Sequence, residues 1–155
     1  MQQITLIRSR SPAGNPRAQR GASLLEVLIA VLILAVGMLG MAALQAITLK
    51  NTGSAAQRSS AVIQSYAMLD MMRANRDAAR AGQYNQGWLC EAPGGGSRIS
   101  NDIAQWIGQL QGAMGESACG RITCGANNCE VGVRWDDSRG TGGASAQQIV
   151  TTSRL

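Results

Sequence analysis

Residues 19–44 read QRGASLLEVLIAVLILAVGMLGMAAL, and this stretch decides the fold of the chain. The run that begins at Val27 and ends at Leu44 contains no charged or strongly polar side chain. Together with the apolar residues just before it, the run reaches the roughly 20 residues that a helix needs to cross a bilayer. Glu26 is the only charge inside the stretch, and Lys50 is the first charge after it. We therefore predict a membrane-spanning helix here.

The segment before this helix is basic. Residues 1–21 contain no acidic residue and four arginines, namely Arg8, Arg10, Arg17 and Arg20. The whole chain of 155 residues has a net charge of +5, so 10 basic and 9 acidic residues remain for residues 22–155, which carry only +1. Basic flanks of a membrane helix stay on the cytoplasmic side. The distribution therefore predicts a cytoplasmic N-terminus and an extracytoplasmic C-terminal region, and it indicates no nucleic-acid partner.

The composition argues against catalysis. The chain has no histidine, which removes the commonest general base and the usual histidine-containing zinc sites. The sequence contains no recognisable nucleophile–base pair, phosphate-binding loop or cluster of metal ligands. We therefore predict a protein that is not an enzyme and that needs no metal or cofactor.

The helix is predicted to continue well beyond the apolar run, from about Ser23 to about Ala81, because no proline interrupts the chain before Gly82. In its second half, apolar residues recur at steps of three and four and form one stripe. The stripe consists of Val62, Ile63, Tyr66, Leu69 and Met72. An all-apolar first half suits lipid, and an amphipathic second half suits packing against a small domain.

Residues 82–155 are predicted to form that domain. Residues 83–98 are interpreted as loop, followed by a short helix at 101–114 that is capped by Ser100 or Asn101. Three strands are expected at 121–124, 129–136 and 147–153, and the short loop GANN joins the first two as a hairpin. Residues expected in the core are Ile103, Trp106, Ile107 and Leu110 on the helix and Val131, Val133 and Trp135 on the second strand. The fold class is therefore α+β, with a long N-terminal helix packed on a small antiparallel sheet.

Four cysteines, Cys90, Cys119, Cys124 and Cys129, all follow the membrane segment. Disulfides, free thiols and a metal site are three alternatives, but the usual zinc spacing is missing and the expected compartment is oxidising. Disulfides are therefore favoured. A hairpin would place Cys124 opposite Cys129, which leaves Cys90 to pair with Cys119.

Two further features of the sequence are given structural interpretations. Asp136 and Asp137 resemble a carboxylate pair or a calcium site, but no further acidic residues cluster near them in the sequence. We interpret them as a turn that ends a strand. The tryptophans are interpreted as core or interface residues and not as a binding platform.

The junction RGASLLEV combines a basic leader, Gly21, a small residue, two leucines and Glu26 ahead of the apolar helix. It resembles the class III signal of type IV pilins and pseudopilins. The resemblance implies that prepilin peptidase cleaves between Gly21 and Ala22 and that the new amino group of Ala22 is methylated, although many family members have an aromatic residue or Met at this position. It also implies that Glu26 pairs with the amino terminus of a neighbouring subunit and sets the register of assembly. The alternative for Glu26 is a carboxylate that simply marks the start of the membrane helix.

A second stretch narrows the resemblance. Residues 68–85, MLDMMRANRDAARAGQYN, together with the apolar helix look like minor pilins of the PilV type, over roughly residues 18–87. This implies a leader at 1–21, an assembly half of the helix at 22–45, an amphipathic half at 46–81 and an extracytoplasmic region at 82–155. The implied location is the inner membrane and then the pilus.

The implied partners are other minor and major pilins, prepilin peptidase, the inner-membrane assembly platform and the lipid bilayer. Two alternatives stay open on the sequence. One is a pseudopilin of a type II secretion system. The other is an extracytoplasmic binding protein held by an uncleaved membrane anchor.

Overall fold

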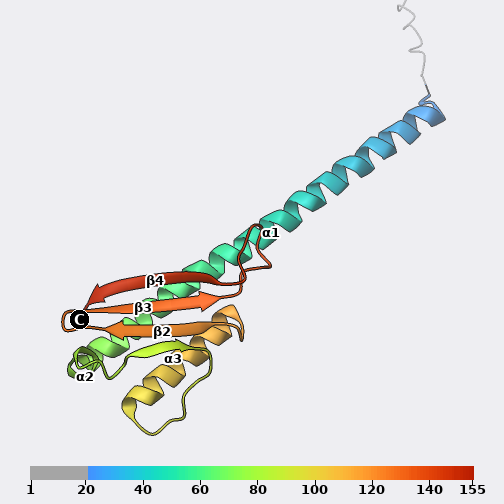
Figure 1. Cartoon of the computed structure of the whole chain (residues 1–155). Helices are drawn as coiled ribbons and strands as arrows, with labels where there is room; N and C mark the ends of the chain where they lie inside the picture. Colours follow the sequence, from blue (N-terminus) through green and yellow to red (C-terminus); the bar gives the residue numbers. More distant parts are fainter. Residues whose placement is uncertain (1–20) are drawn as a thin grey trace, which may run out of the picture. The chain divides into compact units, whose positions relative to one another are not determined.

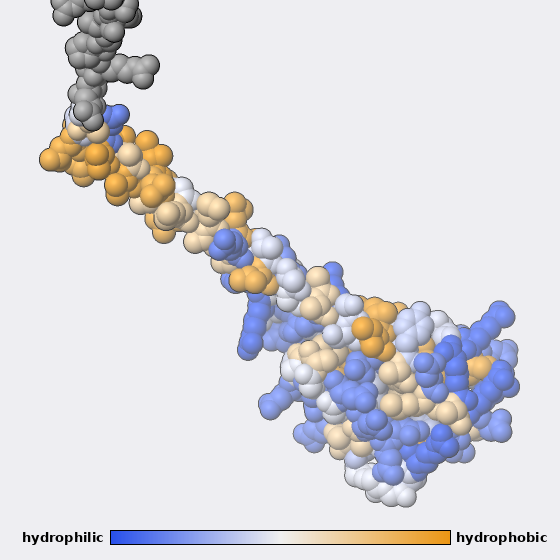
Figure 2. Space-filling model, turned by 180° about the vertical axis from the view of Figure 1, so that it is seen from behind, coloured by the Kyte–Doolittle hydropathy of each residue, from blue (hydrophilic) through white to orange (hydrophobic). Residues whose placement is uncertain are grey.

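The computed structural model describes residues 21–155, so all of the predicted leader except Gly21 lies outside the described residues. The described residues divide into two compact units, with the boundary between Gly40 and Met41. In the first unit the described residues form the start of helix α1 (Leu24–Ala74), whose apolar side chains there are all exposed. Figure 2 shows these apolar side chains gathered along this part of α1. By length and composition α1 is able to cross a membrane.

The second unit contains the rest of α1 and a mixed domain, coloured from green to red in Figure 1. Its four strands form one antiparallel sheet, in which the strands lie side by side in chain order. The fold is thus a long N-terminal apolar helix packed on a small antiparallel sheet with extra helices, a pilin-like α+β arrangement that confirms the predicted fold class. The remaining elements are α2 (Arg76–Arg80), β1 (Gln86–Leu89), α3 (Arg98–Met114), β2 (Cys119–Cys124), β3 (Asn128–Trp135) and β4 (Gln147–Arg154).

The core lies between one face of the sheet and the two helices α1 and α3. Alternation along β3 turns Val131, Val133 and Trp135 inward, and all three are fully buried, as the sequence predicted. The predicted apolar face of α3 is confirmed as well, with Met114 added to it. The residues that make up this face are Ile103, Trp106, Ile107, Leu110 and Met114.

A glycine makes the closest approach between α3 and the sheet possible. A Cβ placed on Gly120 of β2 would overlap the ring carbons Cζ3 and Cη2 of Trp106 and come within 3.1 Å of Ile107 Cδ1. The Trp106 ring therefore occupies the space that a side chain at this position would need. The indole Nε1 also donates a hydrogen bond of 3.0 Å to the main-chain oxygen of Gln64 on α1, so Trp106 connects all three layers.

The buried face of α1 differs from the predicted stripe. Leu69 and Met72 are buried as expected, but Val62, Ile63 and Tyr66 remain 37%, 62% and 49% exposed. Their places are taken by Ala61, Ser65 and Met68. This face lies beside the Gln64 main-chain oxygen that accepts from Trp106, and the Ser65 hydroxyl can be buried because it donates to the main-chain oxygen of Ala61 at 2.8 Å. The helix is therefore rotated from the predicted orientation.

The end of the long helix was also predicted wrongly. Helix α1 ends at Ala74, and the separate helix α2 covers part of the stretch that was predicted to continue it to Ala81. Asn75 breaks the helix with φ −135° and ψ 52°, and its side-chain amide donates to the Tyr84 hydroxyl at 3.1 Å. A contact with a residue nine positions away has outweighed the local helix propensity.

Two boundaries in the following region need correction. The predicted loop at 83–98 contains β1, a fourth strand with only four residues. Helix α3 starts at Arg98 and not near 101, because the N-cap is Ser97 and not Ser100 or Asn101. Ser97 Oγ accepts from the Ser100 main-chain nitrogen at 3.1 Å, and Ser100 Oγ accepts from the Ser97 nitrogen at 3.0 Å, which makes a capping box.

Both pairs of cysteines form disulfides, Cys90–Cys119 and Cys124–Cys129. These are the pairs that the hairpin argument favoured. The second bridge joins residues that face each other directly in the β2–β3 register. The first bridge ties the segment after β1 to the start of β2, 29 residues later, and so holds both ends of the connection that carries α3.

Candidate functional site

The first candidate site is the N-terminal end of α1. Gly21, Ala22 and Ser23 precede the helix and are exposed. The main-chain nitrogen of Glu26 donates to the Ser23 hydroxyl at 3.2 Å and to the Ser23 main-chain oxygen at 3.0 Å. Ser23 thus satisfies one of the main-chain N–H groups that a helix start leaves without an intrahelical acceptor.

The pattern Ser23-x-x-Glu26 is a capping-box signature, and this signal in the sequence was overlooked. The local helix start is therefore sufficient to explain a glutamate at position 26, because a carboxylate in the first turn also interacts favourably with the helix dipole. Glu26 is exposed in the first turn of α1, at the head of an exposed apolar surface. The Glu26 carboxylate, the short segment 21–23 before the helix and the apolar side chains that follow are therefore all exposed at this end of α1.

The second candidate site is the junction formed by two short motifs within residues 68–85, RANR at 73–76 and GQYN at 82–85. Tyr84 is fully buried, and its hydroxyl donates to Asp102 Oδ2 of α3 at 2.6 Å while it accepts from Asn75. Burial raises the pKa of Tyr84 above 10.0, and the hydrogen bond to Asp102 raises it further. These contacts fix the turn after α1 to α3, so the motif residues hold the domain together.

The neighbouring residue of the GQYN motif ties the same turn to the sheet. The Asn85 side chain accepts from the main-chain nitrogen of Cys124 at 2.6 Å and donates to the Cys124 oxygen at 3.3 Å. Gly82 has a φ of 73°, a conformation that favours glycine, and it ends the helical region as predicted. The RANR and GQYN stretches therefore act as a structural junction of the domain.

The Tyr84 contact predicts a stability that falls in alkali. Because the pKa of Tyr84 is raised in the folded state, the unfolded chain loses this proton first, and folding stability decreases as the pH rises above about 10. Tyr84→Phe should cost about 1–2 kcal/mol at neutral pH and flatten this decline. Thermal unfolding of the full chain, followed by circular dichroism at pH 8–11, measures both effects. Tyr66→Phe, at an exposed position, is the matched control, and an unchanged alkaline slope in Tyr84→Phe would contradict the assignment.

The two aspartates after β3 have separate roles. Asp136 Oδ1 accepts from the Ser138 main-chain nitrogen at 2.9 Å, which lowers the pKa of Asp136 and agrees with the predicted turn. Asp137 is only 2% exposed, and its carboxylate accepts from the Ser54 hydroxyl of α1 at 2.6 Å, with Arg58 at 3.8 Å. Asp137 therefore fastens the β3–β4 loop to the helix, a role that the sequence did not reveal.

The tryptophans are mainly core residues. Trp106 and Trp135 are buried, whereas Trp88 is half-buried on the outer face of the sheet. There the guanidinium groups of Arg121 and Arg134 lie 5.4 and 4.7 Å from the Trp88 ring centroid. Within residues 21–155, no three histidine, cysteine, aspartate or glutamate side chains form a group able to hold a metal ion.

One comparison with known proteins bears on the N-terminal end of α1. Residues 16–42 match the family model described as the prokaryotic N-terminal methylation motif. No curated protein and no solved structure matches the chain. The matched motif supports membership of the type IV pilin and pseudopilin superfamily and points to a structural, non-enzymatic protein. Together with the apolar start of α1, it fits a membrane-anchored pilin that associates with other pilins and with prepilin peptidase.

Proposed function

We propose that this protein is a minor pilin that takes part in type IV pilus assembly, as a subunit of the priming or tip complex. The observation that carries the proposal is the match of residues 16–42 to the methylation motif, which runs directly into the exposed apolar part of α1. An apolar helix segment that stays exposed among residues 21–155 needs either lipid or other helices around it. Lipid surrounds the helix while the protein is in the bilayer, and other helices surround it in a bundle of pilin subunits.

The proposed processing follows the chain from its N-terminus. Prepilin peptidase cleaves between Gly21 and Ala22 on the cytoplasmic side, and the new amino group of Ala22 is methylated. This removes residues 1–21, leaves residues 22–45 as the membrane and assembly segment, and places residues 82–155 in the periplasm. The exposed, irregular backbone at Gly21 and Ala22 supports this order, because a peptidase needs an accessible peptide bond ahead of the helix.

Glu26 is proposed to set the register of assembly. Four residues separate it from the new amino terminus, and its carboxylate pairs with the terminal ammonium of a neighbouring subunit. A charge pair away from water adds little net stability, but it distinguishes one register from another. The exposed apolar residues Val62, Ile63 and Tyr66 in the second half of α1 extend the surface available to neighbouring helices.

The PilV type of minor pilin is the narrower proposal, and it rests on the RANR and GQYN stretches. Since pseudopilins share the N-terminal motif, a subunit of a type II secretion pseudopilus is the second candidate. Purification of cross-linked complexes from cells separates the two, because either pilus subunits or secretion pseudopilins are recovered with the protein. An uncleaved anchor on a binding protein is the third candidate, from a different class.

The deciding experiment is the intact mass of the protein purified from the membranes of cells that contain prepilin peptidase. We expect the loss of 21 residues from the 155-residue, 16.2 kDa chain, together with the addition of one methyl group. The same protein from cells that lack the peptidase should keep its full length. A full-length mass in both strains would overturn the pilin proposal and favour the uncleaved anchor.

A further inference from the structure

The sheet has two edge strands, and they differ in how well they are protected against pairing with another chain. Strand β1 has four residues and a shift in its register with β2, and a short, irregular edge offers little to pair with. Strand β4 has eight residues, pairs with β3 without a break from Gln147 to Arg154, and lies outermost in Figure 1. Its sequence, QQIVTTSR, contains no proline or glycine and no charge before its last residue. Strand β4 therefore lacks the features by which edge strands usually avoid such pairing.

The outer main-chain groups of β4 have no strand to bind among residues 21–155. Every second residue of an edge strand directs its N–H and C=O groups away from the sheet. Outside β3, no main-chain group of the described residues forms a hydrogen bond with the main chain of β4. No residue of β4 is buried either. The edge thus offers a row of main-chain donors and acceptors that a second extended chain is able to satisfy.

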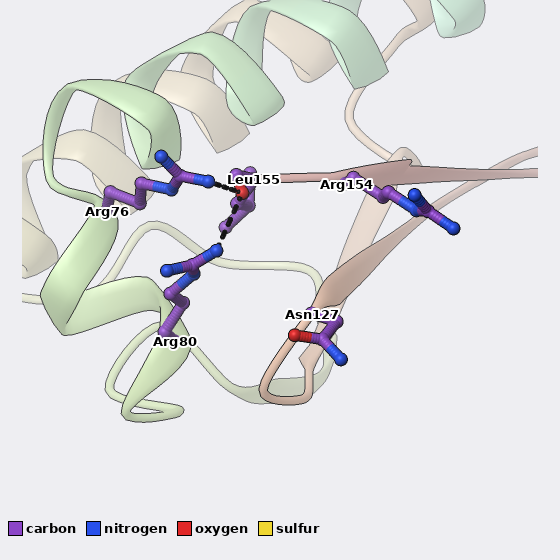
Figure 3. A pocket seen from close by; sticks show the side chains of 5 residues that line it. All are labelled: Arg76, Arg80, Asn127, Arg154 and Leu155. Carbon is purple, nitrogen blue, oxygen red and sulfur yellow. Dashed lines mark hydrogen bonds between the residues drawn. The ribbon is translucent and has the colours of Figure 1, made fainter.

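Both ends of β4 are held in place. Beyond its last residue, the main-chain oxygen of Leu155 accepts from Arg76 and Arg80 of α2, as Figure 3 shows. At the other end, the loop before β4 is fastened to α1 by the hydrogen bond from Ser54 to Asp137. A strand fixed in this way loses little freedom when a second strand pairs with it, and this favours binding.

The surface beside this edge is apolar and belongs to α1. Arg73 of α1 donates to the Ser153 hydroxyl of β4 at 2.7 Å, so this side of the helix borders the strand. Val62 and Tyr66 lie on the same side as Arg73, because steps of four and seven residues return to one face of a helix. Along α1 they also lie between the attachment points at Ser54 and Arg73. Val62 and Tyr66 are 37% and 49% exposed, so they are available to the side chains of an added strand.

We propose that the free edge of β4 binds an extended segment of a partner protein by strand addition, and that this segment has apolar side chains at every second position. Main-chain hydrogen bonds hold such a segment, and the side chains that face α1 select its sequence. Because residues 147–153, Val62 and Tyr66 carry no charge, an uncharged segment fits this site better than an acidic or basic one. The inference goes beyond the proposed function, since it concerns the domain and not the N-terminal motif. It assigns Val62 and Tyr66 to the bound segment and leaves Ile63 to neighbouring helices.

A second copy of this chain is a poorer occupant of the edge. The β4 side chains on the side of α1 are those of every second residue from Gln147 to Ser153, and Ile149 is the one apolar residue among them. Two copies paired edge to edge would therefore bring mostly polar side chains to the apolar side of α1. The occupant is for this reason assigned to a different chain.

The test uses the isotope-labelled full chain in an uncharged maltoside detergent, with amide hydrogen exchange followed at each residue by NMR. In the protein alone, alternate amides of β4 should exchange roughly ten-fold faster than those between them, which bond to β3. The probe is the peptide Lys-Thr-Val-Thr-Val-Thr-Val-Thr-Lys. It should slow exchange of the fast set in a saturable way and leave the other set unchanged. The same peptide with its two central threonines replaced by proline should have no effect, because proline has no N–H to donate.

Val62→Ser should weaken peptide binding roughly five-fold, because it removes apolar surface beside the edge. The matched control is Ile63→Ser, since Ile63 is more exposed, at 62%, but points about 100° further around α1. It should leave binding unchanged, and equal losses in the two variants would reduce the effect to general hydrophobic adhesion and overturn the proposal.

Two other outcomes would also overturn the proposal. One is exchange in β4 that the peptide does not slow. The other is slow exchange of both sets of amides in the protein alone together with a dimer on size-exclusion chromatography, because a second copy would then occupy the edge. Neither outcome bears on the proposed function, because the intact mass reports cleavage whether or not the peptide binds.

Discussion

Gly21→Val should leave the protein at its full mass in cells that contain prepilin peptidase, whereas the unchanged protein loses residues 1–21. A branched side chain at this position restricts the extended, closely approached backbone that a peptidase needs at the bond between Gly21 and Ala22. The variant should still insert in the membrane, since the apolar helix is unchanged, but it should fail to enter pili. Intact-mass measurement of the membrane fraction and immunoblots of sheared pili give the two readouts.

Gly14→Val is the control for this prediction, because Gly14 is the only other glycine of the leader and lies outside the matched residues 16–42. It should be processed normally. If Gly21→Val ran at the mature mass and still supported pili, cleavage at this position and the pilin proposal would both fail. The effect is expected to be close to all-or-none, which makes it the sharpest test of the N-terminal site.

Gly120→Ala should be the most disruptive single change in the domain. The added methyl group has no space, because the Trp106 ring fills it and Ile107 lies close by. Such overpacking costs about 1–3 kcal/mol, and the upper end applies here because the neighbour is a rigid ring held by its hydrogen bond to Gln64. For a domain of this size, we expect the melting temperature to fall by roughly 10 °C. Thermal unfolding by circular dichroism provides the measurement.

The matched control is Gly87→Ala on β1, where an added Cβ would meet open space. It should change the melting temperature by no more than a degree or two. Combining Gly120→Ala with Trp106→Leu tests the mechanism, because both changes act on one contact and their effects should not add. If the double variant lost as much stability as the sum of the two single variants, the overlap between Gly120 and Trp106 would not be the cause.

The sequence predicted the parts of this fold that depend on local periodicity. The apolar run from Val27 to Leu44, the apolar face of α3 and the alternation along β3 each repeat with the period of their own element, and each forms as expected. The N-terminal motif was readable for a similar reason, because it lies in one continuous stretch. The capping role of Ser23 was not predicted, although the Glu three residues later is a local signal for it.

The errors share a different cause, since they arise from contacts between distant residues. Asn75 ends α1, and its side chain donates to the hydroxyl of Tyr84. The buried face of α1 carries Ala61 and Ser65, beside the Gln64 oxygen that accepts from Trp106. Asp137 can be buried because its carboxylate accepts a hydrogen bond from Ser54, which lies 83 positions earlier in the chain. A surface pocket likewise brings together residues of α2, the β2–β3 turn and the end of β4, namely Arg76, Arg80, Asn127, Arg154 and Leu155. Sequence periodicity gives no signal for contacts between distant residues, so these features could be identified only from the three-dimensional structure.

The order of the strands also has a consequence for folding kinetics. The strands of the sheet pair in chain order, so the β2–β3 and β3–β4 pairs form by closing short connections. A short connection loses less conformational entropy on closure than a long one, which favours early pairing of these strands. The contacts of α1 with the sheet and with α3 span far more of the chain, as the 42 positions between Gln64 and Trp106 illustrate. We therefore expect the strands to pair early and the second half of α1 to dock on them last. A subunit anchored at its first residues would thus complete its core only after the whole chain has emerged.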